Sequence, residues 1–231
     1  MSFTSADLER EKLASLRQFA YGLSHEINNP LTNIATRAQM LLAGEKDPER
    51  RKALETINAQ AFRAFEMLAD LMLFAHPPAP QKTTFDVREL LTELSQQHQS
   101  TAQSQQTNLA FVELTESPQL TADRTQIASA LAAFIKNALE ALRSGGTISL
   151  SAVLDASNIE FRVTDNGPGI TLEIRRHLFD PFFSGREAGR GLGLGLAKAW
   201  RVAELHHGEI IVASEPGHGA TFVLRVPLAD N

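Results

Sequence analysis

Residues 19–31 read FAYGLSHEINNPL, within a longer stretch whose apolar residues recur every three or four positions. This spacing indicates an α-helix with one buried face, formed by Leu16, Phe19, Leu23, Ile27, Leu31, Ile34, Ala38 and Leu41. At about 100° per residue, His25 points roughly 160° away from the apolar positions two residues to either side, so its imidazole should stand out. Asn29 follows one turn later on the same side, and Glu26 is the adjacent acid. Pro30 is unusual inside a helix, because it cannot bond the carbonyl of Glu26.

The N-terminal part of the sequence predicts two long helices. The first covers about residues 5–43 and ends at Gly44, a residue that favours helix C-caps. The second covers about residues 48–75, with Asp47 as N-cap and Pro48 at the first helical position. Its apolar residues also recur at helical spacing, at Leu54, Ile57, Ala61, Ala64, Leu68, Leu71 and Ala75.

Two helices joined by a short loop form an antiparallel hairpin. A single hairpin cannot cover two apolar stripes of this length. We therefore predict that residues 1–76 form a homodimer in which two hairpins make a four-helix bundle. The alternative is that the hairpin packs against the domain that follows it.

A proline-rich linker at residues 77–81 separates the hairpin from a second domain at residues 82–231. There the pattern alternates between strands, at 83–85, 109–114, 119–121, 147–154, 159–164, 209–213 and 221–226, and helices, at 86–104, 123–142 and 192–205. Antiparallel strands interleaved with helices predict an α/β sandwich in which helices cover one face of a sheet. The whole chain is thus expected to be of the α+β class.

Composition excludes several functional classes. The 231 residues include no cysteine, which rules out disulfides, thiol chemistry and cysteine-ligated metals. The formal charge of −5 gives no basic footprint for nucleic acid. No apolar run approaches the ~18 residues of a membrane span, and no signal peptide opens the chain. We expect a cytoplasmic protein, or the cytoplasmic part of a larger or membrane-associated protein, without direct membrane insertion.

Four segments of the second domain are candidates for chemistry. Asn137 falls at the edge of an apolar helical stripe, where a polar side chain can reach a cleft. Asp165 ends a strand and is followed by Gly167 and Gly169, which allow close backbone approach. An aromatic cluster covers residues 178–183. Residues 189–196, GRGLGLGL, lead into a helix whose first N–H groups suit a phosphate.

In this order, the segments resemble the boxes of a two-component sensor histidine kinase. Residues 25–31 resemble its H box, 137–141 the N box, 165–170 the first glycine box, 178–183 the F box and 189–196 the second glycine box. The resemblance implies a dimerisation and histidine-phosphotransfer hairpin, followed by the ATP-binding fold shared with gyrase, the Hsp90 chaperones and MutL. That fold is not a Walker-type P-loop, and no G-x-x-x-x-G-K-[ST] occurs here.

The resemblance also implies roles for individual residues. His25 would take the γ-phosphoryl group of ATP, with Glu26 as general base, and pass it to an aspartate of a response-regulator receiver domain. Apart from the resemblance, Asn29 lies one turn after His25 on the same exposed face, so we expect its amide to position water for a phosphatase activity toward that regulator; the alternative is a solvated helix residue. ATP binding would involve Asn137 holding Mg²⁺, Asp165 accepting from the adenine amino group, Gly167 and Gly169 beside the base, Arg186 on a mobile lid, and Gly191, Leu192 and Gly193 at the phosphates.

The sequence departs from the family pattern at Ala133, Arg190 and Ala220, which affects fine nucleotide contacts. Four histidines of the second domain, His177, His206, His207 and His218, are expected in ordinary surface or structural roles. Two alternatives stay open. One is an ATPase-driven conformational machine of the same superfamily, and the other is a catalytically weak dimeric scaffold or phosphatase of a response regulator.

Overall fold

The computed structural model describes residues 5–112, 118–155, 157–183 and 193–228, with the side chains at 5–17, 19–21, 23–25 and 74 excepted. The chain divides into two compact units, Met1–Pro78 and Ala79–Asn231, which are described separately below. Among the described residues, no helix is both long enough and apolar enough to cross a membrane.

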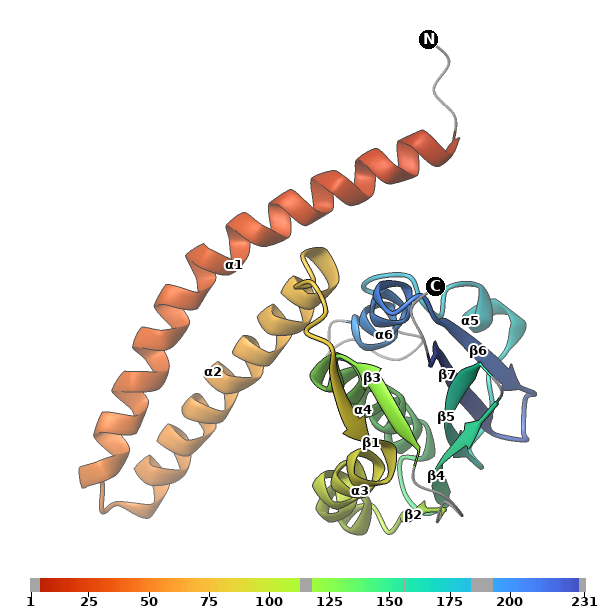
Figure 1. Ribbon diagram of the computed structural model, residues 1–231. Coiled ribbons are helices and arrows are strands. Elements are labelled where there is room, and N and C mark those ends of the chain that lie inside the picture. Colours follow the sequence, from red (N-terminus) through yellow and green to blue (C-terminus); the bar gives the residue numbers. More distant parts are fainter. Residues whose placement is uncertain (1–4, 113–117, 156, 184–192, 229–231) are drawn as a thin grey trace. The chain divides into compact units, whose positions relative to one another are not determined.

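The first unit is a hairpin of two helices, α1 (Ser5–Gly44) and α2 (Pro48–Ala75), which run antiparallel (Figure 1). The predicted start of α2 is confirmed. Asp47 is its N-cap, and its carboxylate Oδ1 accepts from the N–H groups of Glu49 and Arg50, both at 3.0 Å. These bonds satisfy two of the N–H groups that a helix start leaves without a backbone partner.

Helix α1 continues through Pro30 without a break. Proline leaves the carbonyl one turn earlier without its usual donor. Polar side chains just after Pro30 add bonds to neighbouring carbonyls. The Thr32 hydroxyl donates to the Asn28 carbonyl at 2.8 Å, and Asn33 Nδ2 donates to the Asn29 carbonyl at 3.2 Å.

The buried residues of the hairpin are mainly small or medium-sized and apolar: Ala35, Ala38, Ala61, Leu68, Leu71 and Ala75. Larger apolar side chains stay exposed at Ile34, Met40, Leu41, Ile57 and Phe62. Within one chain Ile34, Leu41 and Ile57 are 46%, 61% and 46% exposed, in line with the prediction that a single hairpin cannot cover both apolar stripes. One partner helix covers only part of another helix's circumference, so an apolar surface remains on the hairpin.

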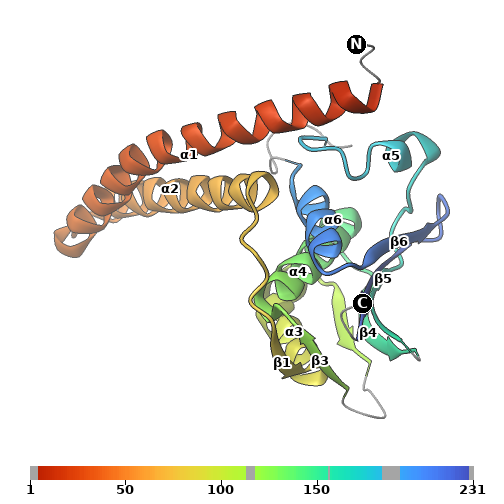
Figure 2. The same cartoon turned by 45° about the horizontal axis from the view of Figure 1, so that its top comes forward.

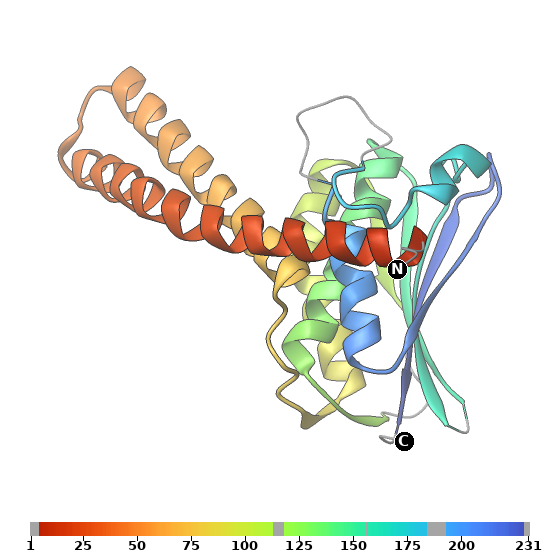
Figure 3. The same ribbon diagram turned by 90° about the horizontal axis from the view of Figure 1, so that it is seen from above.

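The second unit contains a five-stranded sheet in the order β2 (Asn108–Phe111), β4 (Thr147–Leu154), β5 (Asn158–Asp165), β7 (Ala220–Pro227) and β6 (Glu209–Ser214). A separate two-stranded sheet pairs β1 (Thr83–Asp86) with β3 (Gln119–Ala122). Three helices, α3 (Val87–Ser104), α4 (Arg124–Leu142) and α6 (Gly195–Leu205), cover one face of the larger sheet (Figures 2 and 3). The predicted sandwich is confirmed.

Three details differ from the prediction. Strand β2 pairs parallel with β4, so the larger sheet is mixed rather than purely antiparallel. Strand β2 ends at Phe111, and part of the predicted strand at 109–114 lies outside the described residues. A short helix, α5 (Leu172–Arg176), was not predicted.

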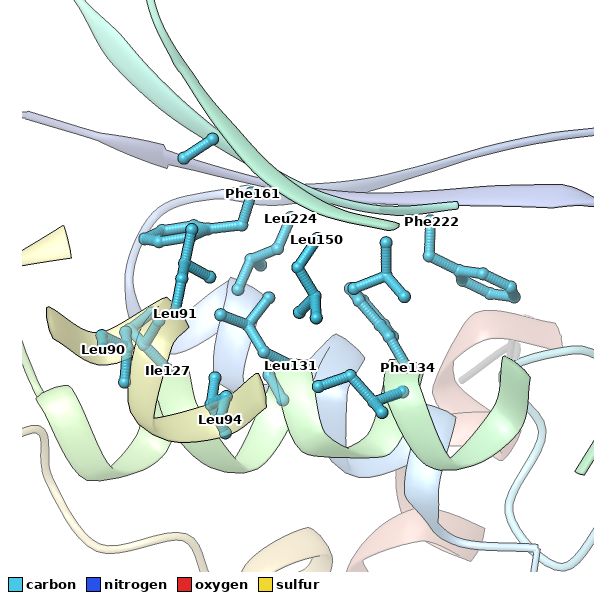
Figure 4. Close-up of a cluster of buried hydrophobic side chains, with 14 of the residues drawn as sticks. Leu90, Leu91, Leu94, Ile127, Leu131, Phe134, Leu150, Phe161, Phe222 and Leu224 are labelled. Atoms are coloured by element: carbon cyan, nitrogen blue, oxygen red, sulfur yellow. The ribbon is translucent and has the colours of Figure 1, made fainter. Parts of the chain in front are cut away.

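The core of this unit lies between the helices and the sheet (Figure 4). Side chains of α3 and α4 point toward side chains of β4, β5 and β7, and the contributors include Leu90, Leu91, Leu94, Ile127, Leu131, Phe134, Leu150, Phe161, Phe222 and Leu224. The rings of Phe134 and Phe222 lie 5.2 Å apart. Burying large side chains of this kind contributes about 1.5–3 kcal/mol each, which fixes α4 firmly on the sheet.

Candidate functional site

Asp165 is a buried acid at the last position of β5. It is 5% exposed and lies in a cross-strand row with Ile148 on β4, Ala220 on β7 and Ser214 on β6. Its Oδ1 accepts from the N–H of Gly167 at 2.8 Å. A carboxylate in so buried a position needs polar donors around it, which makes Asp165 a suitable acceptor for an amino group of a ligand.

The loop after Asp165 packs against the turn between β6 and β7. Gly169 has a φ of +71°, and an added methyl there would lie 2.1 Å from the Glu215 carbonyl oxygen. The Gly217 N–H donates to the Pro168 carbonyl at 2.7 Å. Glycine at 169 is thus required by a backbone contact inside the domain, a constraint that the sequence could not reveal.

Gly167 meets a different constraint. A methyl added there would lie 2.8 Å from Asp165 Oδ1 and 3.7 Å from the Cβ of Ala141 on α4. Glycine at this position therefore leaves room for the Asp165 carboxylate and allows the loop to approach the end of α4. Asn166 has a structural task, since its Oδ1 accepts from the Thr147 N–H at 2.8 Å and ties the loop to β4.

Asn137 lies on α4 between the two glycine segments. One turn before it, Ala133 has its Cβ 3.7 Å from where a methyl at Gly195 would be, and one turn after it, Ala141 neighbours Gly167. Residues four apart share a helix face, so half-buried Asn137 faces the interval between the start of α6 and the loop after β5. The structure thus brings this predicted residue beside both segments.

The second glycine segment is described only from Gly193 onward, and Arg186, Arg190, Gly191 and Leu192 lie outside the described residues. Gly193 has a φ of +66°, and an added methyl would lie 2.5 Å from the Phe183 carbonyl oxygen. Helix α6 then begins at Gly195, and in the described part of the chain no side chain caps its first turn. Uncapped N–H groups at a helix start suit an anion.

His177 takes part in the turn that follows α5, although only an ordinary surface or structural role was expected for it. Its Nδ1 lies 2.6 Å from Asp180 Oδ2, and its ring lies 5.3 Å from that of Phe183. Phe182, the residue directly before Phe183, has a φ of +65°, a conformation that is uncommon for a bulky residue. The spacing of three residues between histidine and aspartate was the available sequence signal.

The residues of the H-box segment lie in the first unit. His25 lies within α1, and its side chain is outside the described set. Glu26 and Asn29 are exposed on the same helix. Asn29 is the fourth residue after His25, so the two positions share one helix face.

The residues of the second unit fit a purine nucleoside triphosphate. A buried carboxylate can accept from an exocyclic amine, and the uncapped start of α6 can receive phosphate. Among the described residues, no group of three or more histidines or acids forms a metal site. Mg²⁺ fits nevertheless, because it is commonly held by few protein oxygens together with water and substrate phosphates, and Asn137 offers one amide oxygen.

Comparison with known proteins divides the chain in the same way. The model of the His Kinase A (phospho-acceptor) domain matches residues 15–80. The model of the histidine kinase-, DNA gyrase B- and HSP90-like ATPase matches residues 122–230.

Curated relatives match along most of the chain. The histidine-protein kinase AtoS of Escherichia coli K12 is 30% identical over 221 residues, covering 95% of this chain and 36% of AtoS. The sensor-like histidine kinase SenX3 of Mycobacterium tuberculosis H37Rv is 34% identical over 227 residues, covering 93% of this chain and 54% of SenX3. The chain therefore spans between about a third and a half of the length of these relatives.

Solved structures share the fold. Full-length ShkA in complex with AMPPNP superimposes with a TM-score of 0.82 at 25% identity, over 93% of this chain and 46% of ShkA. ThkA in complex with the response regulator TrrA gives a TM-score of 0.67 at 24% identity, over 95% of this chain and 64% of ThkA.

Proposed function

We propose that this chain, which belongs to the two-component sensor histidine kinases, phosphorylates its own His25 from ATP and passes the phosphoryl group to an aspartate of a response-regulator receiver domain. The observation that carries the proposal is the presence, in one chain, of a phospho-acceptor hairpin and an ATPase domain. An ATPase-driven machine without a phospho-acceptor would not need the hairpin. ATP and receiver domains are found in the cytoplasm, where we expect the chain to act.

Nucleotide binding follows from the second unit. Asp165 accepts a hydrogen bond from the adenine amino group, while Gly167 and Gly169 shape the loop beside the base. Residues 191–193 and the start of α6 receive the phosphates, and Arg186 adds a cation from the lid. Asn137 holds Mg²⁺, which neutralises charge on the phosphates when it is bound.

Phosphoryl transfer then uses the first unit. A neutral ring nitrogen of His25 attacks the γ-phosphorus, the bond between the γ-phosphorus and the bridging oxygen breaks, and ADP leaves. Glu26 orients the ring and accepts the proton from the other ring nitrogen. Imidazole suits this step because much of it is neutral and nucleophilic near pH 7.

A second copy of the chain is the partner that best fits the hairpin. The exposed apolar side chains Ile34, Met40, Leu41, Ile57 and Phe62 supply the surface that a four-helix bundle would bury. In this arrangement a homodimer presents its H-box segments to the receiver domains.

Asn29 favours a second activity, dephosphorylation of the regulator. It is exposed one turn after His25, and an amide can donate to and accept from the same water, which positions that water for in-line attack. Asn29→Ala should retain autophosphorylation and phosphotransfer but release phosphate from the phosphorylated regulator at least tenfold more slowly. The measurement is phosphate release with wild-type or variant protein plus ADP. Equal rates of phosphate release with wild type and Asn29→Ala would exclude this role and indicate that Asn29 is simply a solvated helix residue.

Incubation with γ-labelled ATP distinguishes the proposed kinase from its alternatives. A kinase acquires label that is acid-labile and alkali-stable, and loses it to a receiver domain. An ATPase-driven machine releases labelled phosphate without protein label, and a silent scaffold does neither. Protein that hydrolyses ATP without becoming labelled would overturn the proposed function.

A further inference from the structure

Ser214 joins two backbone segments that lie on either side of Asp165. It is the last residue of β6, and its hydroxyl accepts from the Ile170 N–H at 2.9 Å and donates to the Gly219 carbonyl at 2.7 Å. In the cross-strand row of the sheet, Ser214 pairs with Ala220, which pairs with Asp165. Residues paired directly across neighbouring strands point to the same face of a sheet. Asp165 and Ser214 therefore lie on the face that the helices cover, the face to which the buried core residue Phe222 also points.

Both segments that the hydroxyl contacts determine where Asp165 sits. Ile170 follows Gly169, in the loop whose Gly167 N–H bonds the Asp165 carboxylate. Gly219 lies directly against the backbone of Asp165, since a methyl added at Gly219 would be 2.0 Å from the Asp165 carbonyl oxygen. One hydroxyl therefore fixes the loop after Asp165 and the strand beside it relative to each other.

Removal of this hydroxyl would take a partner from each segment. The Ile170 N–H would lose an acceptor, and the Gly219 carbonyl would lose a donor, which costs free energy wherever water cannot replace them. The bond from the Gly217 N–H to the Pro168 carbonyl would remain and keep the loop attached to the turn. The expected consequence is a displaced Asp165 carboxylate in a domain that still folds.

We propose that Ser214 is a positioning residue for recognition of the nucleotide base: it holds Asp165 where the carboxylate meets the exocyclic amine of the purine. The inference rests on the ATP binding proposed above, and it adds a residue that sets selectivity for a 6-aminopurine. Ser214 acts through Ile170 and Gly219 and makes no contact with the base itself.

The test compares affinities for ATP and for purine riboside triphosphate, which lacks the 6-amino group. Ser214→Ala should bind ATP about five- to tenfold more weakly, as expected for losing one or two hydrogen-bond partners. Its affinity for purine riboside triphosphate should change much less, so the preference for ATP should shrink. Autophosphorylation at saturating ATP should stay near the wild-type rate.

Thr221→Ala is the matched control. Thr221 lies on β7 next to Ala220, and its hydroxyl is 3.0 Å from that of Thr164, on the face of the sheet opposite to Asp165 and Ser214. This variant loses a hydroxyl from the same sheet and should retain the wild-type preference for ATP. If Ser214→Ala only reduced stability, its affinities for ATP and for purine riboside triphosphate would fall by the same factor. That result would overturn the proposal.

Ser214→Thr and Ser214→Val form a second pair, because threonine and valine have nearly the same shape and both suit a strand. The threonine variant should keep the preference for ATP, and the valine variant should lose it. Equal preference in the two variants would rule out the role of Ser214, even where the alanine variant does not fold. Wild-type protein that binds neither triphosphate would instead refute the proposed function.

Discussion

At the scale of single residues, Asp123 and His206 meet where the linker enters the second unit. Asp123 Oδ1 accepts from the Gln126 N–H at 3.0 Å and caps α4, while Oδ2 accepts from the Gln81 N–H at 2.8 Å. The Asp123 N–H donates to Nε2 of His206 at 3.1 Å. Since Nε2 accepts, the ring proton lies on Nδ1 and is donated to the Val202 carbonyl at 2.9 Å.

His206 therefore has a structural role, as expected from the sequence, but one that depends on its neutral form. It is 4% exposed, and this burial lowers its pKa below the ordinary value. The Val202 carbonyl and Asp123 act in the opposite direction, whereas Lys82 and His207 add to the lowering. Protonation would place a charge in the core and remove the acceptor for the Asp123 N–H.

This arrangement predicts a pH-dependent stability of the second unit. A depressed histidine pKa in the folded state gives stability that is full above the unfolded pKa of about 6.5 and is lost as pH falls below it. The unfolding free energy, followed through Trp200, should therefore fall more between about pH 7.5 and 5.5 in wild type than in His206→Gln, which does not titrate.

His218→Gln is the control, because His218 is an exposed histidine of the second unit that is not among the groups that shift the pKa of His206. It should keep the wild-type pH dependence, whereas His206→Gln should also lose about 1–2 kcal/mol at neutral pH through its altered hydrogen bonds. Parallel pH profiles for wild type and His206→Gln would show that the ring does not control stability.

Asn137 provides a prediction for the nucleotide site. Asn137→Ala should weaken binding of Mg-ATP by about tenfold or more, because it removes an oxygen ligand from a cation that few protein groups hold. The domain should stay folded, since the side chain is only half-buried at the edge of the core. The affinity for Mg-ATP is measured by titration calorimetry. Lys136→Ala is the control, because Lys136 is an exposed neighbour of Asn137 on α4 and its replacement should leave the affinity unchanged. Unchanged affinity in Asn137→Ala would exclude the metal role.

At the scale of elements, the sequence predicted what local chemistry determines. Three aspartates, Asp47, Asp86 and Asp123, were identified as helix starts, and each accepts backbone N–H groups as a cap. Strand β2 was placed by its apolar residues, but its parallel pairing with β4 joins two strands that β3 and α4 separate in the chain, and local patterns do not report such a pairing. Helix α5 was missed because five residues give too short a pattern, although Thr171 caps it.

The glycines also show the difference between what the local sequence predicts and what only distant contacts explain. Their positions were predicted from the sequence, but the reasons at Gly169 and Gly193 are contacts with the carbonyls of Glu215 and Phe183. Such contacts join residues that are not neighbours in the sequence, and periodicity does not report them. Ser214 was overlooked for this reason, since neither of its hydrogen-bond partners is adjacent in sequence.

The hairpin gives a prediction of assembly. A fragment of residues 1–78 should sediment as a dimer at micromolar concentration, and a fragment of residues 79–231 as a monomer. Leu41→Glu should weaken the dimer by at least about tenfold, because a charge would enter the apolar surface that the second copy covers. Leu41 is 61% exposed in the single chain, so its replacement leaves the fold of the hairpin intact.

An exposed polar position supplies the control for this experiment. Gln39→Glu introduces the same charge on α1 outside the apolar set, and it should leave the dimer unchanged. A monomeric hairpin from wild-type protein at micromolar concentration would contradict the four-helix bundle and favour packing of the hairpin against another domain.

At the scale of the whole molecule, the proposed phosphoryl acceptor and the nucleotide residues lie in different compact units. This separation follows from the sequence, where the proline-rich linker stands between the H-box segment and the other boxes. It implies that nucleotide binding and phosphoryl acceptance can be removed independently, which a single-site ATPase would not allow.

The most direct test of the proposed kinase is therefore His25→Gln, assayed for nucleotide affinity and for label from γ-labelled ATP. We predict ATP affinity within about twofold of wild type and no acid-labile, alkali-stable label, because glutamine lacks a nucleophilic ring nitrogen. His207→Gln, which alters an exposed histidine of the second unit, should retain the label. Undiminished acid-labile label on His25→Gln would contradict the assignment of His25 as the phosphoryl acceptor.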